Sequence, residues 1–400
     1  MFWRKWPGGV VYYSYHSSVN EEVRGVIQES MRHWEENTCL KFRPRSVFNL
    51  WYINFRTDNA GCWSQVGMEE QLGPQDLNIG KGCEHVSVVV HELGHAVGFF
   101  HEQSRSDRDG SIRILWENIP VDKYSQFMQT YDRNRNVPYD ITSVMHYSQG
   151  AFSASPFTKN TIVTTNPHMQ LRMGNKGLSF RDRRLANLMY SCSDGCPNKD
   201  LNCQNEGFLF RPSTAERNEP CQCVCPDNTA GDKCQDINGD YYREPSCGGN
   251  VTTEGSFETP GFPERNVPYD EGCTWWIQAP ADQRVEMTID EFSIQPRLNR
   301  PSSRYHGTCA VERAEIRTKD RYRGDMYCGK ELNPGQTLRS RTNEMVVILS
   351  PMKSSQGKGM KATVRFVGNA GASGGADMAM DVVGTAGDFV NSQTSLGRPG

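Results

Sequence analysis

The segment from His91 to His101 contains three histidines and a glutamate at spacings that suit metal chemistry. On a helix, His91 and His95 lie one turn apart on the same face, so two imidazoles can converge on one ion, with Glu92 beside them as a base. Gly98 permits a sharp turn that brings His101 back as a third nitrogen ligand. Chance gives this pattern with a probability on the order of 0.0001. It therefore predicts a zinc hydrolase rather than a buried helix with surface histidines.

The overall composition excludes several classes of protein. The chain has 400 residues and a net charge of -3, with acidic and basic residues interspersed. This length predicts two or three modules, and no basic stripe indicates a nucleic-acid partner. The longest apolar stretch, 86–100, is interrupted by charged and polar residues and is too short for a membrane span. We expect a soluble protein.

The cysteine content indicates an oxidising compartment. There are 14 cysteines, an even number, and they are densest between Cys192 and Cys247. This usage favours a secreted, extracellular protein over a cytosolic one with free thiols. The sequon at Asn250 is a candidate glycosylation site and agrees with secretion. No apolar signal region precedes Trp6, so we interpret the start as a fragment or a truncated gene model that lacks its signal peptide.

The first half of the chain has an α+β order of elements. Apolar residues at helical spacing behind Asn20 predict a helix over 20–37. Runs of β-branched and aromatic residues predict strands at 10–15, 40–43, 51–55 and 64–67. Further helices are expected at 121–131 and 179–190. The charged run 102–109 predicts a solvated loop on its composition alone.

The second half changes character twice. Residues 196–234 are rich in cysteine and poor in core-forming side chains, so disulfides must hold this segment together. From Cys247, short apolar runs at 274–277, 285–289, 344–349 and 362–366 predict a β-sandwich. The segment 369–400 is rich in Gly, Ala and Ser without periodicity, and we expect a disordered tail.

Four segments together resemble the astacin family of zinc endopeptidases. They are HELGHAVGFFHEQSRSDRD at 91–109, the Trp6-Pro7-Gly8-Gly9 opening, Gly61-Cys62-Trp63-Ser64, and SVMHY at 143–147. Other metzincins share the extended zinc motif, whereas Glu102 directly after the third histidine and Tyr147 two residues after Met145 are typical of astacins. The resemblance covers 1–192 and implies an α+β metzincin catalytic domain there.

The resemblance implies a role for each residue of the motif. His91, His95 and His101 would hold one Zn²⁺ per chain, which polarises a water molecule. Glu92 would take the proton of that water as general base and pass it to the leaving amine. Tyr147 would be a fifth ligand that swings away and donates to the oxyanion.

Two more residues would support the site. The resemblance implies that Met145 forms an apolar floor beneath the metal. It implies that Glu102 is linked through water to the amino group of the mature chain. The residues before Trp6 do not match the family's mature start, and we interpret the pro-segment that would block the zinc as missing from this chain.

The resemblance continues past the catalytic domain. It implies an EGF-like module over 193–235 and an all-β CUB sandwich over 247–368. It also implies seven disulfides, which use all 14 cysteines: Cys39–Cys192, Cys62–Cys83, Cys196–Cys221, Cys203–Cys223, Cys225–Cys234, Cys247–Cys273 and Cys309–Cys328.

Two binding properties of the family depend on residues that can be located in this sequence. Some CUB domains bind calcium through three acids, and the matching positions here are Gln295, Glu312 and Pro351, so we predict no calcium site. Family members often prefer an acidic residue after the cut bond. Lys176 and Arg172 are candidates for the basic pocket residue, although each could be an ordinary surface base.

We therefore predict a secreted zinc endopeptidase that cuts extracellular or matrix proteins, similar to hatching enzymes and to nematode moulting or cuticle-collagen proteases. The alternative is a catalytically silent secreted binding protein that uses its CUB and EGF-like modules. A structural zinc protein would need a fourth cysteine or histidine ligand, and the nearby cysteines are assigned to disulfides. The sequence predicts no nucleic-acid partner and indicates no oligomeric state.

Overall fold

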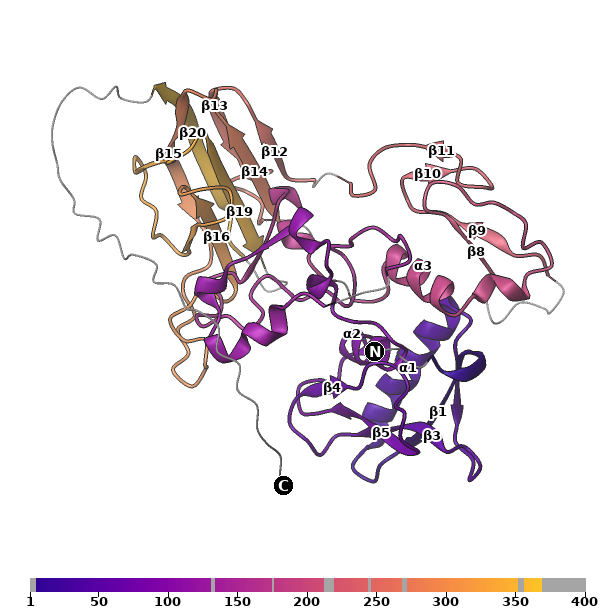
Figure 1. Cartoon of the computed structure of the whole chain (residues 1–400). Coiled ribbons are helices and arrows are strands. Elements are labelled where there is room, and N and C mark those ends of the chain that lie inside the picture. The colour runs from indigo at the N-terminus through magenta and orange to yellow at the C-terminus, as the bar shows by residue number, and fades with distance from the viewer. Residues whose placement is uncertain are drawn as a thin grey trace, which may run out of the picture.

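The computed structural model describes residues 5–130, 134–174, 176–211, 219–243, 246–267, 272–351 and 356–368. Its sandwich of strands, β12 to β20, lies beside the middle part of the chain, and the N-terminal sheet with α1 and α2 lies farther away (Figure 1). The predicted tail at 369–400 is outside the described residues. Among the described helices, none is both long and apolar enough to span a bilayer.

A five-stranded sheet with two helices forms the N-terminal part. The sheet has the order β2-β1-β3-β5-β4, in which only β4 runs antiparallel to its neighbour. Its strands are β1 (Val10–Tyr15), β2 (Lys41–Pro44), β3 (Trp51–Arg56), β4 (Cys62–Ser64) and β5 (Gly73–Ile79). The predicted strand at 64–67 is wrong in its bounds, because the strand ends at Ser64. Gly67, at φ +73°, turns the chain and donates its N–H to His95 O at 2.8 Å.

Helix α1 (Glu21–Asn37) confirms the predicted helix and its cap. The Asn20 side chain accepts a hydrogen bond from Val23 N at 2.9 Å, which satisfies one free donor of the first turn. The apolar stripe of α1 is buried against α2 (Val86–Ala96), and Trp34 Nε1 donates to Val90 O at 3.1 Å. Each large side chain buried here contributes about 1.5–3 kcal/mol. This packing holds α2, which carries the metal motif.

The segment from 102 to 195 is mostly 3-10 helix and turn. Its 3-10 helices are Glu102–Ser104, Arg108–Gly110, Trp116–Asn118, Val121–Phe127, Pro167–Arg172 and Cys192–Gly195, and another, Pro7–Gly9, precedes β1. Strands β6 (Ile112–Ile114) and β7 (Ile162–Thr164) pair antiparallel. Helix α3 (Phe180–Met189) confirms the predicted 179–190 helix and starts with a capping box of Ser179 and Asp182.

The α-helix predicted at 121–131 is wrong. The chain forms a 3-10 helix over Val121–Phe127, and 131 lies outside the described residues. Of this segment only Phe127 is buried, whereas Val121 is 78% and Met128 is 58% exposed. The apolar residues therefore form no continuous stripe that an α-helix could bury.

A small disulfide-held unit follows α3. Its strands pair as two short ladders, β8 (Phe208–Phe210) with β9 (Gln222–Val224) and β10 (Thr229–Ala230) with β11 (Asp236–Ile237). Disulfides join Cys196–Cys221, Cys203–Cys223 and Cys225–Cys234. The unit has few buried apolar side chains, so the covalent links replace a large core.

The C-terminal part is a sandwich of two sheets. One has the order β12-β14-β19-β16-β17 and the other β13-β20-β15-β18. The strands are β12 (Gly248–Val251), β13 (Gly255–Glu258), β14 (Cys273–Gln278), β15 (Gln283–Ser293), β16 (Glu312–Arg317), β17 (Asp325–Tyr327), β18 (Thr337–Arg339), β19 (Glu344–Pro351) and β20 (Gly359–Gly368). Apolar side chains from both sheets fill the space between them. The predicted all-β sandwich is confirmed.

The remaining disulfides lie in the two larger units. They join Cys39–Cys192, Cys62–Cys83, Cys247–Cys273 and Cys309–Cys328, so the structure contains the seven pairs that the sequence led us to expect. No cysteine is free.

Candidate metal centre and active site

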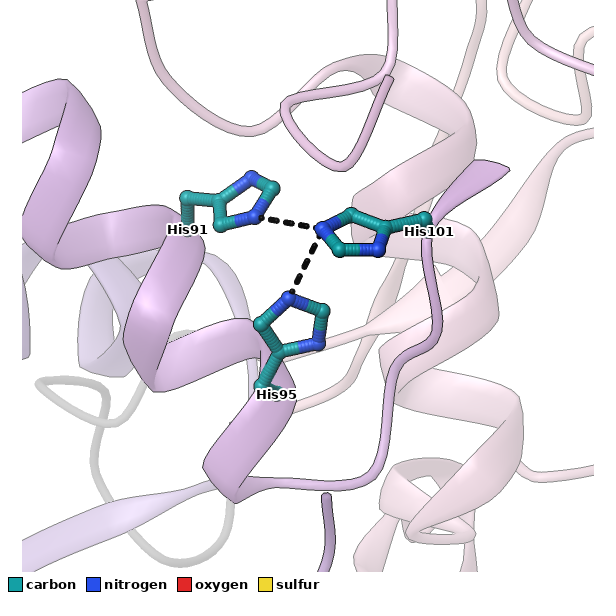
Figure 2. A group of neighbouring side chains, drawn as sticks. All are labelled: His91, His95 and His101. Atoms are coloured by element: carbon teal, nitrogen blue, oxygen red, sulfur yellow. Dashed lines mark hydrogen bonds between the residues drawn. The ribbon is translucent and has the colours of Figure 1, made fainter. Parts of the chain in front are cut away.

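Three imidazoles converge at the C-terminal end of α2. His91 and His95 project from one face of the helix, and the chain after the helix brings His101 opposite them (Figure 2). The distance from His101 Nε2 is 3.3 Å to His91 Nε2 and 3.2 Å to His95 Nε2. Gly98, at φ +110°, makes the turn that returns the chain, as its sequence position predicts.

The orientation of two imidazoles is fixed by backbone carbonyls. His91 Nδ1 lies 2.7 Å from Val144 O, and His95 Nδ1 lies 2.8 Å from Phe99 O. Each Nδ1 must carry the proton to donate to a carbonyl, so each Nε2 presents a lone pair. Burial lowers the pKa of His95 to about 3 and that of His101 to about 2, which keeps both rings neutral. Neutral imidazole is the form that binds a metal.

The donor set fits zinc. Nitrogen ligands about 2.05 Å from one ion in a tetrahedron are about 3.3 Å apart, which agrees with the observed Nε2 separations. Converging lone pairs repel one another unless a cation lies between them. In the described part of the chain, no fourth cysteine, histidine or carboxylate joins this group. Three protein ligands with an open position are typical of catalytic rather than structural zinc.

Glu92 is buried beside the histidines without a partner for one oxygen. Its Oε2 has no hydrogen bond within the described residues. Burial raises the pKa of Glu92 to about 8. A desolvated carboxyl group facing a metal site has the basicity that proton transfer near neutral pH requires.

Tyr147 lies across the site from α2. Its ring centroid is 4.4 Å from that of His101, and its backbone N–H donates to Gln103 Oε1 at 3.1 Å. Burial, and then the Glu92 charge, raise the pKa of the phenol to about 12. The hydroxyl is therefore a proton donor at neutral pH. Phe127 and Phe152 pack around the ring and limit its orientations.

Met145 lies directly beneath α2, fully buried. A Cβ added to Gly94 would be only 2.5 Å from Met145 Sδ, so glycine is what allows this approach. The residue thus forms an apolar floor under the metal helix.

The charged run 102–109 is a partly buried network and not the solvated loop expected from composition. Glu102, Arg105 and Arg108 are buried. Glu102 Oε1 accepts from Asp140 N at 2.7 Å and from Arg105 Nη1 at 3.1 Å. Burial raises the pKa of Glu102 to about 8, while the Arg105 charge opposes this shift. The predicted link from Glu102 to the chain's amino group involves residues 1–4, which lie outside the described residues.

Sequence reasoning missed Asp182, which connects α3 to the methionine turn. The carboxylate accepts from Ser143 Oγ at 2.6 Å, Val144 N at 2.8 Å and Ser179 N at 3.0 Å. Val144 O is the acceptor for His91 Nδ1. Asp182 therefore positions the metal ligand His91 indirectly, because it holds Val144, whose carbonyl orients the His91 ring. Its signal in the sequence is the capping-box spacing from Ser179.

The cleft around these groups has a volume of about 590 Å³. Trp63 and Ser64 of edge strand β4 line one side, and Ser148 and Phe152 line another. An exposed strand edge can pair with an extended peptide. Neither Arg172 nor Lys176 is among the lining residues, so their assignment to a substrate pocket stays a prediction.

Other predicted sites lie away from the cleft. Asn250 is exposed on β12, and its Oδ1 bonds His168 Nε2 at 2.9 Å, which leaves the amide nitrogen available for a glycan. Glu312 is buried on β16 and accepts from Gln295 N at 2.9 Å. Pro351 is paired with Glu312 in the sheet. The predicted lack of calcium at these three positions stays a prediction.

Family models match two parts of the chain. Residues 1–191 match the model of the astacin peptidase family, and residues 247–364 match that of the CUB domain. Every ligand and supporting residue of the histidine site lies within the first match.

Several curated proteins are similar across both parts. Blastula protease 10 of Paracentrotus lividus is 34% identical over 381 residues, which cover 91% of this chain and 59% of that protein. Zinc metalloproteinase dpy-31 of Caenorhabditis elegans is 33% identical over 381 residues, which cover 92% of this chain and 60% of that protein. The chain thus spans about three fifths of the length of these relatives. The structure of high choriolytic enzyme 1, a hatching enzyme zinc-protease of Oryzias latipes, is 35% identical, with a TM-score of 0.44, over 48% of this chain and 94% of that one.

Proposed function

The chain belongs to the astacin family of zinc metalloproteinases, and on this premise we propose that it is a secreted zinc endopeptidase. The observation that carries the proposal is the convergence of three neutral imidazoles, with Glu92 buried beside them and an open side toward the cleft. A binding protein would have no need of a desolvated base at that position.

The protein's own residues divide the work of peptide hydrolysis. When bound by His91, His95 and His101, one zinc ion supplies the Lewis acid that activates water and polarises the peptide carbonyl. Glu92 accepts a proton at its free Oε2 and delivers it to the leaving amine. Tyr147 holds its hydroxyl proton at neutral pH and donates to the oxygen that becomes negative. Aromatic packing around Tyr147 confines this donor to the cleft.

The substrate class follows from the cleft and from the attached modules. An extended polypeptide would pair with β4 and place its scissile bond over the histidines. We propose extracellular or matrix proteins, such as cuticle or egg-envelope components, in line with the hatching-enzyme and blastula-protease relatives. Seven disulfides support an extracellular location.

We also propose the division into modules that the sequence predicts. It consists of a catalytic domain over 1–192, an EGF-like module over 193–235 and a CUB domain over 247–368. Disulfides that connect the first cysteine of 193–235 with the third, the second with the fourth and the fifth with the sixth support the EGF-like assignment.

Cleavage of a quenched peptide library by wild-type and Glu92→Ala protein tests the proposal, with the zinc content of both measured. We expect one zinc in each protein and cleavage by the wild type alone. If both hold zinc and neither cuts any peptide, the chain is a binding protein and the endopeptidase proposal fails.

A further inference from the structure

A buried polar network joins the catalytic domain to the sandwich. Arg317 of β16 is fully buried, and its Nε donates to Glu315 Oε1 at 2.7 Å. From the catalytic domain, Gln170 Oε1 accepts from Arg317 Nη2 at 2.9 Å, and Asn160 Nδ2 donates to Glu315 Oε2 at 2.9 Å. Satisfied buried polar groups of this kind fix one arrangement of the two units. Figure 1 shows β16 beside the middle segment of the chain.

A cavity of about 630 Å³ lies at this junction, and both units line it. Ser148 and Phe152 line this cavity and also the catalytic cleft, so the two spaces adjoin. Ser148 directly follows Tyr147. A substrate chain leaving the catalytic centre therefore reaches the junction cavity within a few residues, at about 3.3 Å per extended residue.

The walls of the cavity are aromatic and basic. Phe157 of the catalytic domain meets Tyr305 of the sandwich edge to face, with ring centroids 4.8 Å apart. The guanidinium of Arg313 lies 5.7 Å from the Phe157 ring, and that of Arg304 lies 4.6 Å from the Tyr305 ring. Among the described residues that line the cavity, none is acidic.

Arg313 is the basic residue of the cavity wall that feels the Glu315 charge without forming an ion pair with it. It lies on β16 at alternate positions with Glu315 and Arg317, so all three face the catalytic domain. Glu315 is engaged by Arg317 and Asn160. Within the described part of the chain, Arg313 makes no ion pair or side-chain hydrogen bond, and it is only partly exposed. Because the oxygens of Glu315 are already bonded to Arg317 and Asn160, the partly buried Arg313 guanidinium keeps its own donors available for an incoming anion.

We propose that the junction cavity is a substrate subsite that binds an acidic side chain of the polypeptide being cut, with Arg313 as the recognising cation and Arg304 at its exposed rim. This inference rests on the proposed endopeptidase function. A planar carboxylate matches the guanidinium fork, and the Phe157–Tyr305 pair covers the aliphatic stem of the bound residue. The sandwich thereby sets cleavage preference directly, through a side chain placed beside the catalytic cleft.

Peptides with amidated C-termini and a single Glu, moved one position at a time on either side of a fixed cut bond, test the subsite. At one position, Glu should raise kcat/KM about tenfold over Gln in the wild type. Arg313→Gln should remove that preference, and Arg313→Lys should restore part of it. Arg365→Gln, on the exposed face of the other sheet, is the matched control and should keep the full preference.

The subsite is refuted if no position shows a Glu preference that Arg313→Gln removes, or if Arg313→Gln abolishes cleavage of Glu and Gln peptides alike. Arg304→Gln alters an exposed side chain and is expected to lower the preference about threefold. This variant provides the same test if Arg313→Gln does not fold.

A binding measurement separates failure of the subsite from failure of the proposed function. Fluorescence anisotropy on Glu92→Ala protein should show about tenfold tighter binding of the best Glu peptide than of its Gln counterpart, and adding Arg313→Gln should remove the difference. Preferential binding without wild-type cleavage would retain the subsite and reject the endopeptidase. Cleavage by the wild type without preferential binding would retain the endopeptidase and reject the subsite.

Discussion

Replacing Asp182 with alanine should weaken zinc binding without touching a ligand. The change leaves three donors, Ser143 Oγ, Val144 N and Ser179 N, without their buried acceptor. Each such loss costs about 1–3 kcal/mol, and removing a buried charge offsets part of the sum, so we expect a decrease of about 3 kcal/mol in the free energy of unfolding. Because Val144 O orients His91, the zinc dissociation constant should rise about tenfold or more.

Two companion variants make this prediction specific. Asp182→Asn retains one acceptor oxygen and should cost about 1 kcal/mol or less. Ser179→Ala removes the N-cap of α3 and should lower the free energy of unfolding by about 1–2 kcal/mol. It leaves the hydrogen bond from Val144 N to Asp182 in place. Denaturant unfolding with disulfides intact and competition with a zinc chelator measure the two quantities. Equal zinc affinity in Asp182→Ala and Ser179→Ala would refute the positioning role.

Three further predictions concern Gly94, Tyr147 and the protonation of Asp182. Gly94→Ala should lower the free energy of unfolding by about 1–2 kcal/mol, measured by thermal or urea unfolding. The added methyl group would collide with Met145, and this steric cost exceeds the gain from the higher helix propensity of alanine. Gly25→Ala, in open space on α1, should instead stabilise the protein by about 1 kcal/mol, and the same sign for both changes would contradict this account. Tyr147→Phe should lower kcat about tenfold to a hundredfold and leave zinc affinity within about twofold; unchanged turnover would remove the hydroxyl from the mechanism. Burial, and then the Asp140 charge, raise the pKa of Asp182 from 3.8 to about 6, so the native state holds a proton there that the unfolded chain has lost. The free energy of unfolding of the wild type should therefore fall, relative to that of Asp182→Asn, as the pH rises from about 4 to about 6. A difference between the two proteins that stays constant over this range would show that the pKa shift is absent.

The parts of the site that could be predicted from the sequence are those set by local spacing. His91, His95 and Gly98 act within one helix and its final turn, so their periodicity is sufficient to place them. The stripe and cap of α1 were predictable for the same reason. The family resemblance supplied Tyr147 and the cysteine pairs, whose partners are far apart in the chain.

The parts that could not be predicted depend on contacts between distant segments. The charged run at 102–109 is buried because Glu102 meets the backbone at Asp140, which composition does not reveal. No α-helix forms at 121–131 because Phe127 alone is buried there, while Val121 and Met128 stay exposed and give no apolar stripe to bury. Arg313 becomes significant only where β16 packs on the catalytic domain.

Stepwise return of zinc to chelator-treated wild-type protein tests the central claim most directly. Turnover of a cleavable peptide should be absent in the stripped protein, rise in proportion to bound zinc, and level off at one zinc per chain. Turnover in the stripped protein, or one tightly bound zinc per chain without cleavage of any peptide in a library, would contradict the account.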